Sequence, residues 1–112
     1  MKTRLKVPIF NCFVTLFTDV DMATIDEDDN ILGVAVQIGD MDYTIHIKND
    51  LDESEFYTTL SHEANHVVCG IADDLGIPTT FDNSEFHCYL HDYLINEFKK
   101  RIERKKRSTK NG

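Results

Sequence analysis

The segment at residues 54–75 reads SEFYTTLSHEANHVVCGIADDL. Its apolar residues recur at helical spacing and form one broad stripe, which predicts a helix over 54–75 with one buried face. Ser54 is a suitable N-cap, and Gly76 and Pro78 favour an end just beyond residue 75. The opposite side of this helix is expected to be a second working face, made by His62, His66, Cys69 and Asp73.

Strands are predicted before this helix and a second helix after it. Residues 9–17, 31–38 and 42–48 are rich in β-branched and aromatic side chains, and 42–48 alternates apolar and polar residues. A loop is expected over 18–30, and an amphipathic helix from Asn83 or Ser84 to about Ile102. The sequence therefore predicts an α+β domain in which a three-stranded sheet packs on the first helix, with the C-terminal helix on its other side.

Length and charge indicate one domain with a basic end. The chain has 112 residues, of which 41% are hydrophobic and 29% charged, as in ordinary globular proteins. Residues 99–112 hold eight of the twelve Lys and Arg and one acid, Glu103, so their charge is +7; subtracting this from −8 leaves −15 for residues 1–98. We expect a domain over 1–102, a flexible basic tail over 103–112, and nucleic-acid contact only through that tail.

Cysteine usage and hydropathy bear on the compartment. The three cysteines, Cys12, Cys69 and Cys88, are odd in number and have no CxxC spacing, which favours reduced thiols in a cytoplasm. Asn11 and Thr15 interrupt the apolar run at 7–17, so we interpret it as a strand and not as a signal peptide. No apolar stretch is long enough to span a bilayer, and no membrane partner is expected.

Residues 62–66 read His-Glu-Ala-Asn-His, an HExxH motif inside the predicted helix. The spacing of four stacks His62 and His66 on one face, where they can share a metal ion. Glu63 lies about 100° away, outside the coordination shell but near its open position, as a general base for a metal-activated water requires. A catalytic zinc also needs a third protein ligand, and Glu85 on the second helix is the candidate, in the order HExxH-x18-E.

In this order the chain resembles the gluzincins, the thermolysin and aminopeptidase-like clan. Residues 33–94 more closely resemble the small zincin-like metallopeptidases encoded by tailed bacteriophages, through the strand pair, the Ser-His-Glu-Ala-Asn-His helix, the Asp-Leu-Gly-Ile-Pro linker and the segment Asn-Ser-Glu-Phe-His-Cys-Tyr-Leu at 83–90. The resemblance implies a minimal zincin-like fold, Zn²⁺ on His62, His66 and Glu85, and peptide-bond hydrolysis, in the host cytoplasm if phage-encoded. It also implies that an extended peptide or protein substrate adds to an edge strand, for which 42–48 is the best match.

Several roles stay open at this stage. Tyr89 could donate its hydroxyl to an oxyanion, Asp73 could accept an imidazole N–H, and Asp92 flanks Glu85 on its own face. His87 and Cys88 depart from the family pattern, in which apolar or small residues are expected. His87 and His91 are four apart, so a closed four-histidine site with the HExxH pair is conceivable. The alternative function is a catalytically inactive, zinc-stabilised interaction module.

Overall fold

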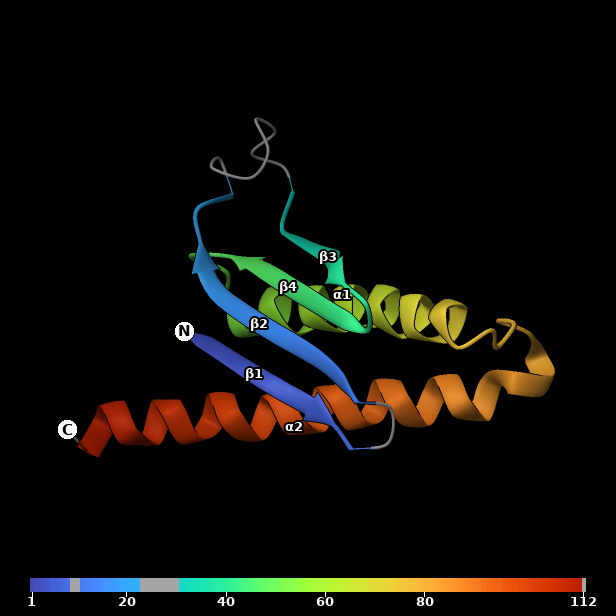
Figure 1. The fold of residues 1–112 in the computed structure, drawn as a ribbon. Helices are drawn as coiled ribbons and strands as arrows, with labels where there is room; N and C mark the ends of the chain where they lie inside the picture. The colour runs from blue at the N-terminus through green and yellow to red at the C-terminus, as the bar shows by residue number, and fades with distance from the viewer. Residues whose placement is uncertain (9–10, 23–30, 112) are drawn as a thin grey trace.

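The computed structural model describes residues 1–8, 11–22 and 31–111, which form a sheet and two long helices (Figure 1). This confirms the predicted α+β class. The strands come first along the chain, and a short 3-10 turn precedes the second helix. The elements are β1 (Lys2–Val7), β2 (Cys12–Val20), β3 (Gly33–Gly39), β4 (Asp42–Lys48), α1 (Glu53–Asp74), η2 (Phe81–Asn83) and α2 (Ser84–Asn111).

The sheet has four strands in the order β1-β2-β4-β3. β2 pairs in parallel with β4, whereas β1 and β3 pair antiparallel with β2 and β4, so β1 and β3 are the edges. The prediction of three strands missed β1, because its cations alternate with only two core residues, Leu5 and Val7. β2 also runs on to Val20, into the predicted loop, while residues 9–10 and 23–30 of the predicted strand and loop lie outside the described residues.

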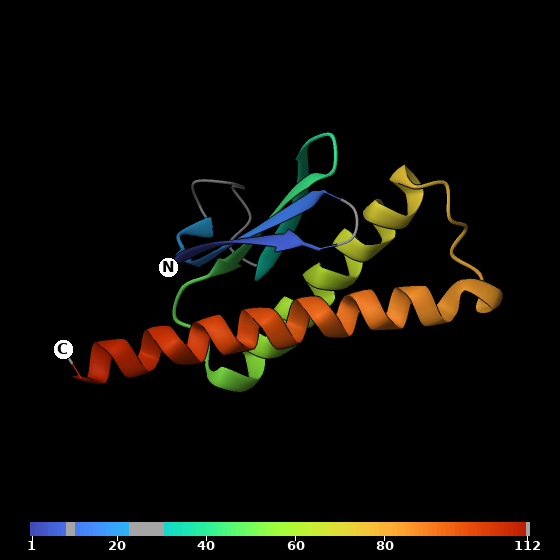
Figure 2. The same cartoon turned by 60° about the horizontal axis from the view of Figure 1, so that its bottom comes forward.

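Both helices cover the same face of the sheet, in a two-layer arrangement (Figure 2). The strand register places Leu5, Val14 and Tyr43 side by side on that face, and all three are buried. The apolar stripes of both helices join them in one core, with Leu60, Ala64, Val67, Val68 and Ile71 from α1 and Leu90, Leu94, Phe98 and Ile102 from α2. The prediction that the C-terminal helix lies on the other side is therefore wrong.

The ends of the helices also differ from the predicted ones. Asp52, not Ser54, caps α1, because its carboxylate accepts a hydrogen bond of 2.8 Å from the backbone N–H of Glu55. α2 continues through 103–111, where a frayed tail was predicted, because its Lys, Arg and Glu residues favour helix and Ile102 is buried against the core. No helix in the described part of the chain is long and apolar enough to cross a membrane.

Candidate metal centre

His62 and His66 lie together on the exposed face of α1. Their Nε2 atoms are 3.2 Å apart, and the rings meet nearly edge to face at an angle of 77°. Two nitrogens bound at 2.0–2.1 Å to one tetrahedral zinc would be separated by about 3.3 Å. The pair predicted from the HExxH spacing therefore has the separation that two ligands of one cation require.

Glu63 points inward from the same turn of α1 and is only 7% exposed. Its Oε1 lies 4.0 Å from Nε2 of His62. The edge strand β3 approaches α1 closely here, because a Cβ added at Gly33 would lie 3.2 Å from Cγ of Glu63 and 2.7 Å from Cγ2 of Thr59. The methylene stem of Glu63 is thus held between helix and strand, and its carboxylate is directed toward the histidine pair.

Glu85 is not brought to this pair. It is exposed in the first turn of α2, whereas His87 faces α1 and its Nε2 donates a 2.7 Å hydrogen bond to Oδ1 of Asn65. Positions two apart on a helix point roughly 200° apart, so Glu85 is directed away from α1. Within residues 1–8, 11–22 and 31–111, no group of three or more His, Cys, Asp or Glu side chains is placed to hold a metal ion.

The four-histidine arrangement is not formed either. His91 lies against α1 as His87 does, with its Nε2 3.1 Å from the carbonyl oxygen of Ser61 and 3.3 Å from its hydroxyl. These contacts join α2 to the flank of α1. Ser61 and Asn65 were not among the predicted site residues, because their polarity on a helix that also carries a buried stripe is a weak signal.

The other predicted site residues lie in solvent. Tyr89 is 70% exposed on the outer side of α2, four residues beyond Glu85. Asp73 is exposed near the end of α1, and the carboxylate of Asp92 lies 3.9 Å from Nδ1 of His91. The structure therefore groups Glu63 with the pair and leaves Tyr89, Asp73 and Asp92 apart from it.

The strand expected to bind the peptide, residues 42–48, is not an edge strand. Residues 42–48 form β4, which is paired with β2 on one side and β3 on the other, so its backbone cannot accept a further strand. The alternation of 42–48 correctly identified its core side, but it carries no information on strand order. The edge beside α1 is β3, where Val36 and Ile38 are 42% and 60% exposed.

No known protein family, curated protein or solved structure matches the chain. The resemblance to gluzincins therefore rests on the motif and its neighbouring segments, and it stays a prediction. The observations that bear on the chemistry are those of the chain itself, namely the spacing of the histidine pair and the position of Glu63.

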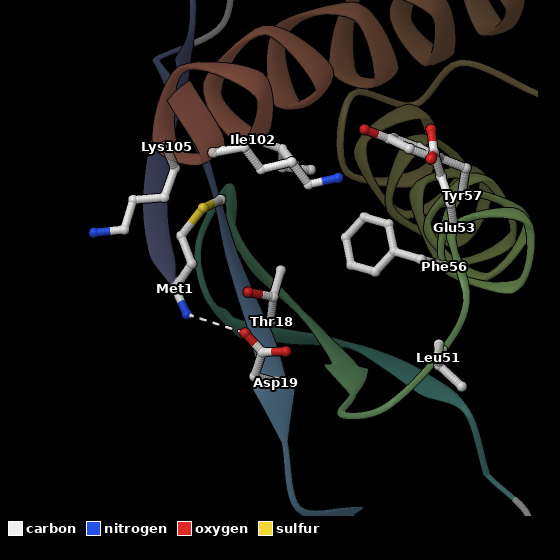
Figure 3. A pocket seen from close by; sticks show the side chains of 10 residues that line it. Met1, Thr18, Asp19, Leu51, Glu53, Phe56, Tyr57, Ile102 and Lys105 are labelled. Atoms are coloured by element: carbon white, nitrogen blue, oxygen red, sulfur yellow. Dashed lines mark ion pairs between the residues drawn. The ribbon is translucent and has the colours of Figure 1, made fainter. Parts of the chain in front are cut away.

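A cavity of about 280 Å³ lies elsewhere, between the start of α1 and the far end of α2 (Figure 3). Its apolar lining includes Leu51, Phe56 and Ile102, and Asp19 stands at its rim, 4.0 Å from the amino group of Met1. None of the HExxH residues lines it. This cavity is thus separate from the candidate metal centre, which is an open surface site.

Proposed function

We propose that the protein is a zinc-dependent peptidase in which His62 and His66 hold the metal and Glu63 is the general base. The observation that carries the proposal is the 3.2 Å separation of the two Nε2 atoms with Glu63 Oε1 4.0 Å from one of them. A bound zinc supplies Lewis-acid polarisation of the scissile carbonyl and lowers the pKa of water. These are the functions that an HExxH helix ordinarily combines.

The role of Glu63 follows from its environment. Its stem is buried against β3, which restricts the carboxylate to the side of the histidine pair. A carboxylate fixed there can take a proton from the attacking water and deliver it to the departing amine, so that one group serves both proton transfers. His62 is 68% exposed, so solvent and substrate reach the site without a conformational opening.

The edge strand β3 supports a peptide as the substrate class. An extended peptide paired with its free edge would run alongside α1, because β3 lies so close to α1 that a Cβ added at Gly33 would be 2.7 Å from Cγ2 of Thr59 and 3.2 Å from Cγ of Glu63. β3 reads GVAVQIG and has no charged side chain that would oppose such pairing. We therefore propose β3, and not residues 42–48, as the strand that pairs with the peptide.

The third metal ligand is a separate question. For Glu85 to reach the histidine pair, the first turn of α2 would have to rotate by roughly half a revolution. This rotation would break the hydrogen bond between His87 and Asn65. Zinc titration followed by NMR of the His87 ring tests this directly. A zinc-dependent change in the chemical shifts of His87 that disappears in Glu85→Ala assigns Glu85 as the third ligand. Unchanged chemical shifts at His87 assign the third coordination position to another group.

The alternative function, an inactive zinc-stabilised module, stays a prediction. A closed structural site needs four protein ligands. In the described residues His87 and His91 contact Asn65 and Ser61, on the flank of α1, and form no metal-binding group with the HExxH pair.

Cleavage of a quenched-fluorescent peptide library with added zinc tests the proposal. We expect turnover by the wild type, a loss of about 10²–10⁴-fold in Glu63→Gln, and no loss in the matched control His91→Gln. Equal cleavage by wild type and Glu63→Gln would point to a contaminating protease and refute the assignment. Zinc binding without turnover in either protein would support the metal site and refute the peptidase activity.

A further inference from the structure

A basic groove separates β1 from the C-terminal half of α2. Its volume is about 420 Å³, and its lining contains four cationic side chains and no carboxylate: Met1, Lys2, Thr3, Arg101, Arg104 and Lys105. Arg101 is fixed there, because its Nη1 donates to the hydroxyl of Thr3 at 3.0 Å and to the carbonyl oxygen of Arg4 at 2.7 Å. Cations from the two ends of the chain are thus combined in one surface.

One face of the sheet is covered by no helix (Figure 2). By register, Lys2, Phe17 and His46 lie side by side on this face. Phe17 and His46 are stacked, with centroids 4.7 Å apart and an angle of 2° between the rings. Lys2 Nζ lies 5.5 Å from the centroid of the Phe17 ring, so a cation and two parallel rings share one patch.

A second cation and ring follow on the same face. Arg4 Cζ lies 4.0 Å from the centroid of the half-buried Phe13 ring, and Lys6 pairs with Phe13 in the strand register. The carboxylate of Asp42 is also present here, with its Oδ2 3.9 Å from Nη2 of Arg4. Positive charge and aromatic surface therefore alternate along β1 and β2.

We propose that this surface, the basic aromatic face, binds single-stranded nucleic acid. We define it by Lys2, Arg4, Lys6, Phe13, Phe17, His46, Arg101, Arg104 and Lys105. A groove of cations that follows the phosphates, combined with rings on which bases stack, is the usual composition of single-strand binding surfaces. Displacement of Lys2 and Arg4 from the Phe17 and Phe13 rings would free the ring faces for bases and the cations for phosphates.

The charge distribution favours this occupant and its orientation. Residues 1–98 carry −15 in total although Lys2, Arg4 and Lys6 are among them, so the rest of the body repels phosphates and leaves the basic aromatic face as the attractive surface. A membrane is a poorer fit, because the two most exposed large apolar side chains, Phe81 at 92% and Tyr89 at 70%, belong to η2 and to the first part of α2 and not to this face. The inference is independent of the proposed peptidase, since His62 and His66 do not belong to the face.

Fluorescence anisotropy with labelled 12-nucleotide oligouridylate and oligothymidylate, using the full chain, tests the proposal. With three or four phosphates contacted, log K should fall with log salt at a slope of about −2 to −3. Arg104→Glu should weaken binding about tenfold and reduce this slope. The matched control is Lys99→Glu, which removes a cation of the same helix that lies 6.0 Å from the Tyr57 ring, outside the groove.

The aromatic part has its own variants. Phe17→Leu should weaken binding roughly five- to 150-fold with an unchanged salt slope, as loss of one stacked base predicts. Phe81→Leu, at a ring exposed elsewhere, should have no effect. Circular dichroism confirms folding of each variant, and Lys6→Glu replaces Arg104→Glu if that protein is unfolded.

Three outcomes would overturn the proposal. The first is no binding to either oligonucleotide in 50 mM salt. The second is an oligonucleotide affinity that Phe17→Leu leaves unchanged and that equals the affinity for polyphosphate, which would show a contact with polyanions only. The third is preferential binding to vesicles that contain phosphatidylserine, which would assign the face to a membrane.

Discussion

Gly33→Ala tests whether β3 is held against α1 at the position of Glu63. The added methyl group would lie 2.7 Å from Thr59 Cγ2, 3.2 Å from Glu63 Cγ and 3.2 Å from the carbonyl oxygen of His46. Thr59 is buried and the carbonyl belongs to the central strand, so neither can yield easily. Overpacking of this kind costs about 1–3 kcal/mol, and the reduced entropy of the unfolded chain offsets about 0.4–1 kcal/mol. We expect a net destabilisation of roughly 1–2 kcal/mol.

The measurement is urea unfolding followed by circular dichroism, with Gly39→Ala as the matched control. Gly39 is in the same strand, but a Cβ there would meet only Asp42 Cβ at 3.8 Å, so its stability should be unchanged or rise by up to about 1 kcal/mol. Thr59→Ser removes the nearest methyl group, and a double-mutant cycle with Gly33→Ala should give a coupling of at least about 0.5 kcal/mol. Equal stability of Gly33→Ala and Gly39→Ala would refute the close packing of β3 on α1.

Three further predictions concern capping and pH. Asp52→Ala should lower the urea midpoint of unfolding, because the Glu55 N–H loses its acceptor, whereas Ser54→Ala should stay within about 0.5 kcal/mol of wild type. The reverse order would restore Ser54 as the cap. Burial raises the pKa of Cys12 from 9.0 to about 11, so the contribution of this thiol to the free energy of unfolding is complete below pH 9 and is lost as pH rises toward 11. Between pH 8 and 11, Cys12→Ala should therefore lose less stability than the wild type. Parallel stability curves for the two proteins would contradict the burial of this thiol. Burial lowers the pKa of His46 from 6.5, so the contribution of the neutral imidazole to the free energy of unfolding is complete above pH 6.5 and is lost as pH falls. His46→Gln should therefore reduce the loss of stability on the acid side of the pH profile. An unchanged profile would exclude this role.

The sequence predicts well what depends on local periodicity. The α1 stripe from Leu60 to Ile71 is buried, and the alternation of 42–48 places Tyr43, Ile45 and Ile47 in the core. The spacing of four likewise brings His62 and His66 together, because one helix carries both.

Relations between elements could not be predicted in the same way. The rotation of α2 about its own axis is decided by which side chains bury best, and burial of Leu90, Leu94 and Phe98 turns Glu85 outward. Strand order depends on long-range pairing, and the parallel insertion of β2 beside β4 converts an expected edge into a central strand. No local pattern in the sequence encodes either result.

The basic aromatic face illustrates the same limit. Lys2 and Arg104 are a whole chain apart in sequence, and they line one groove only because β1 lies beside α2. From the sequence, the basic residues of 99–112 were predicted to act as a tail alone. The fold instead combines them with β1, which gives the charge a defined shape.

The most direct test of the metal centre is the zinc content of the purified chain after equilibration with zinc and removal of free metal. We predict about one zinc per chain in the wild type and in Glu63→Gln, and none in His62→Ala, because the pair shares one cation. Asp73→Ala is the matched control and should retain the metal. A wild-type chain without zinc, or a His62→Ala chain with the full amount, would contradict the metal centre.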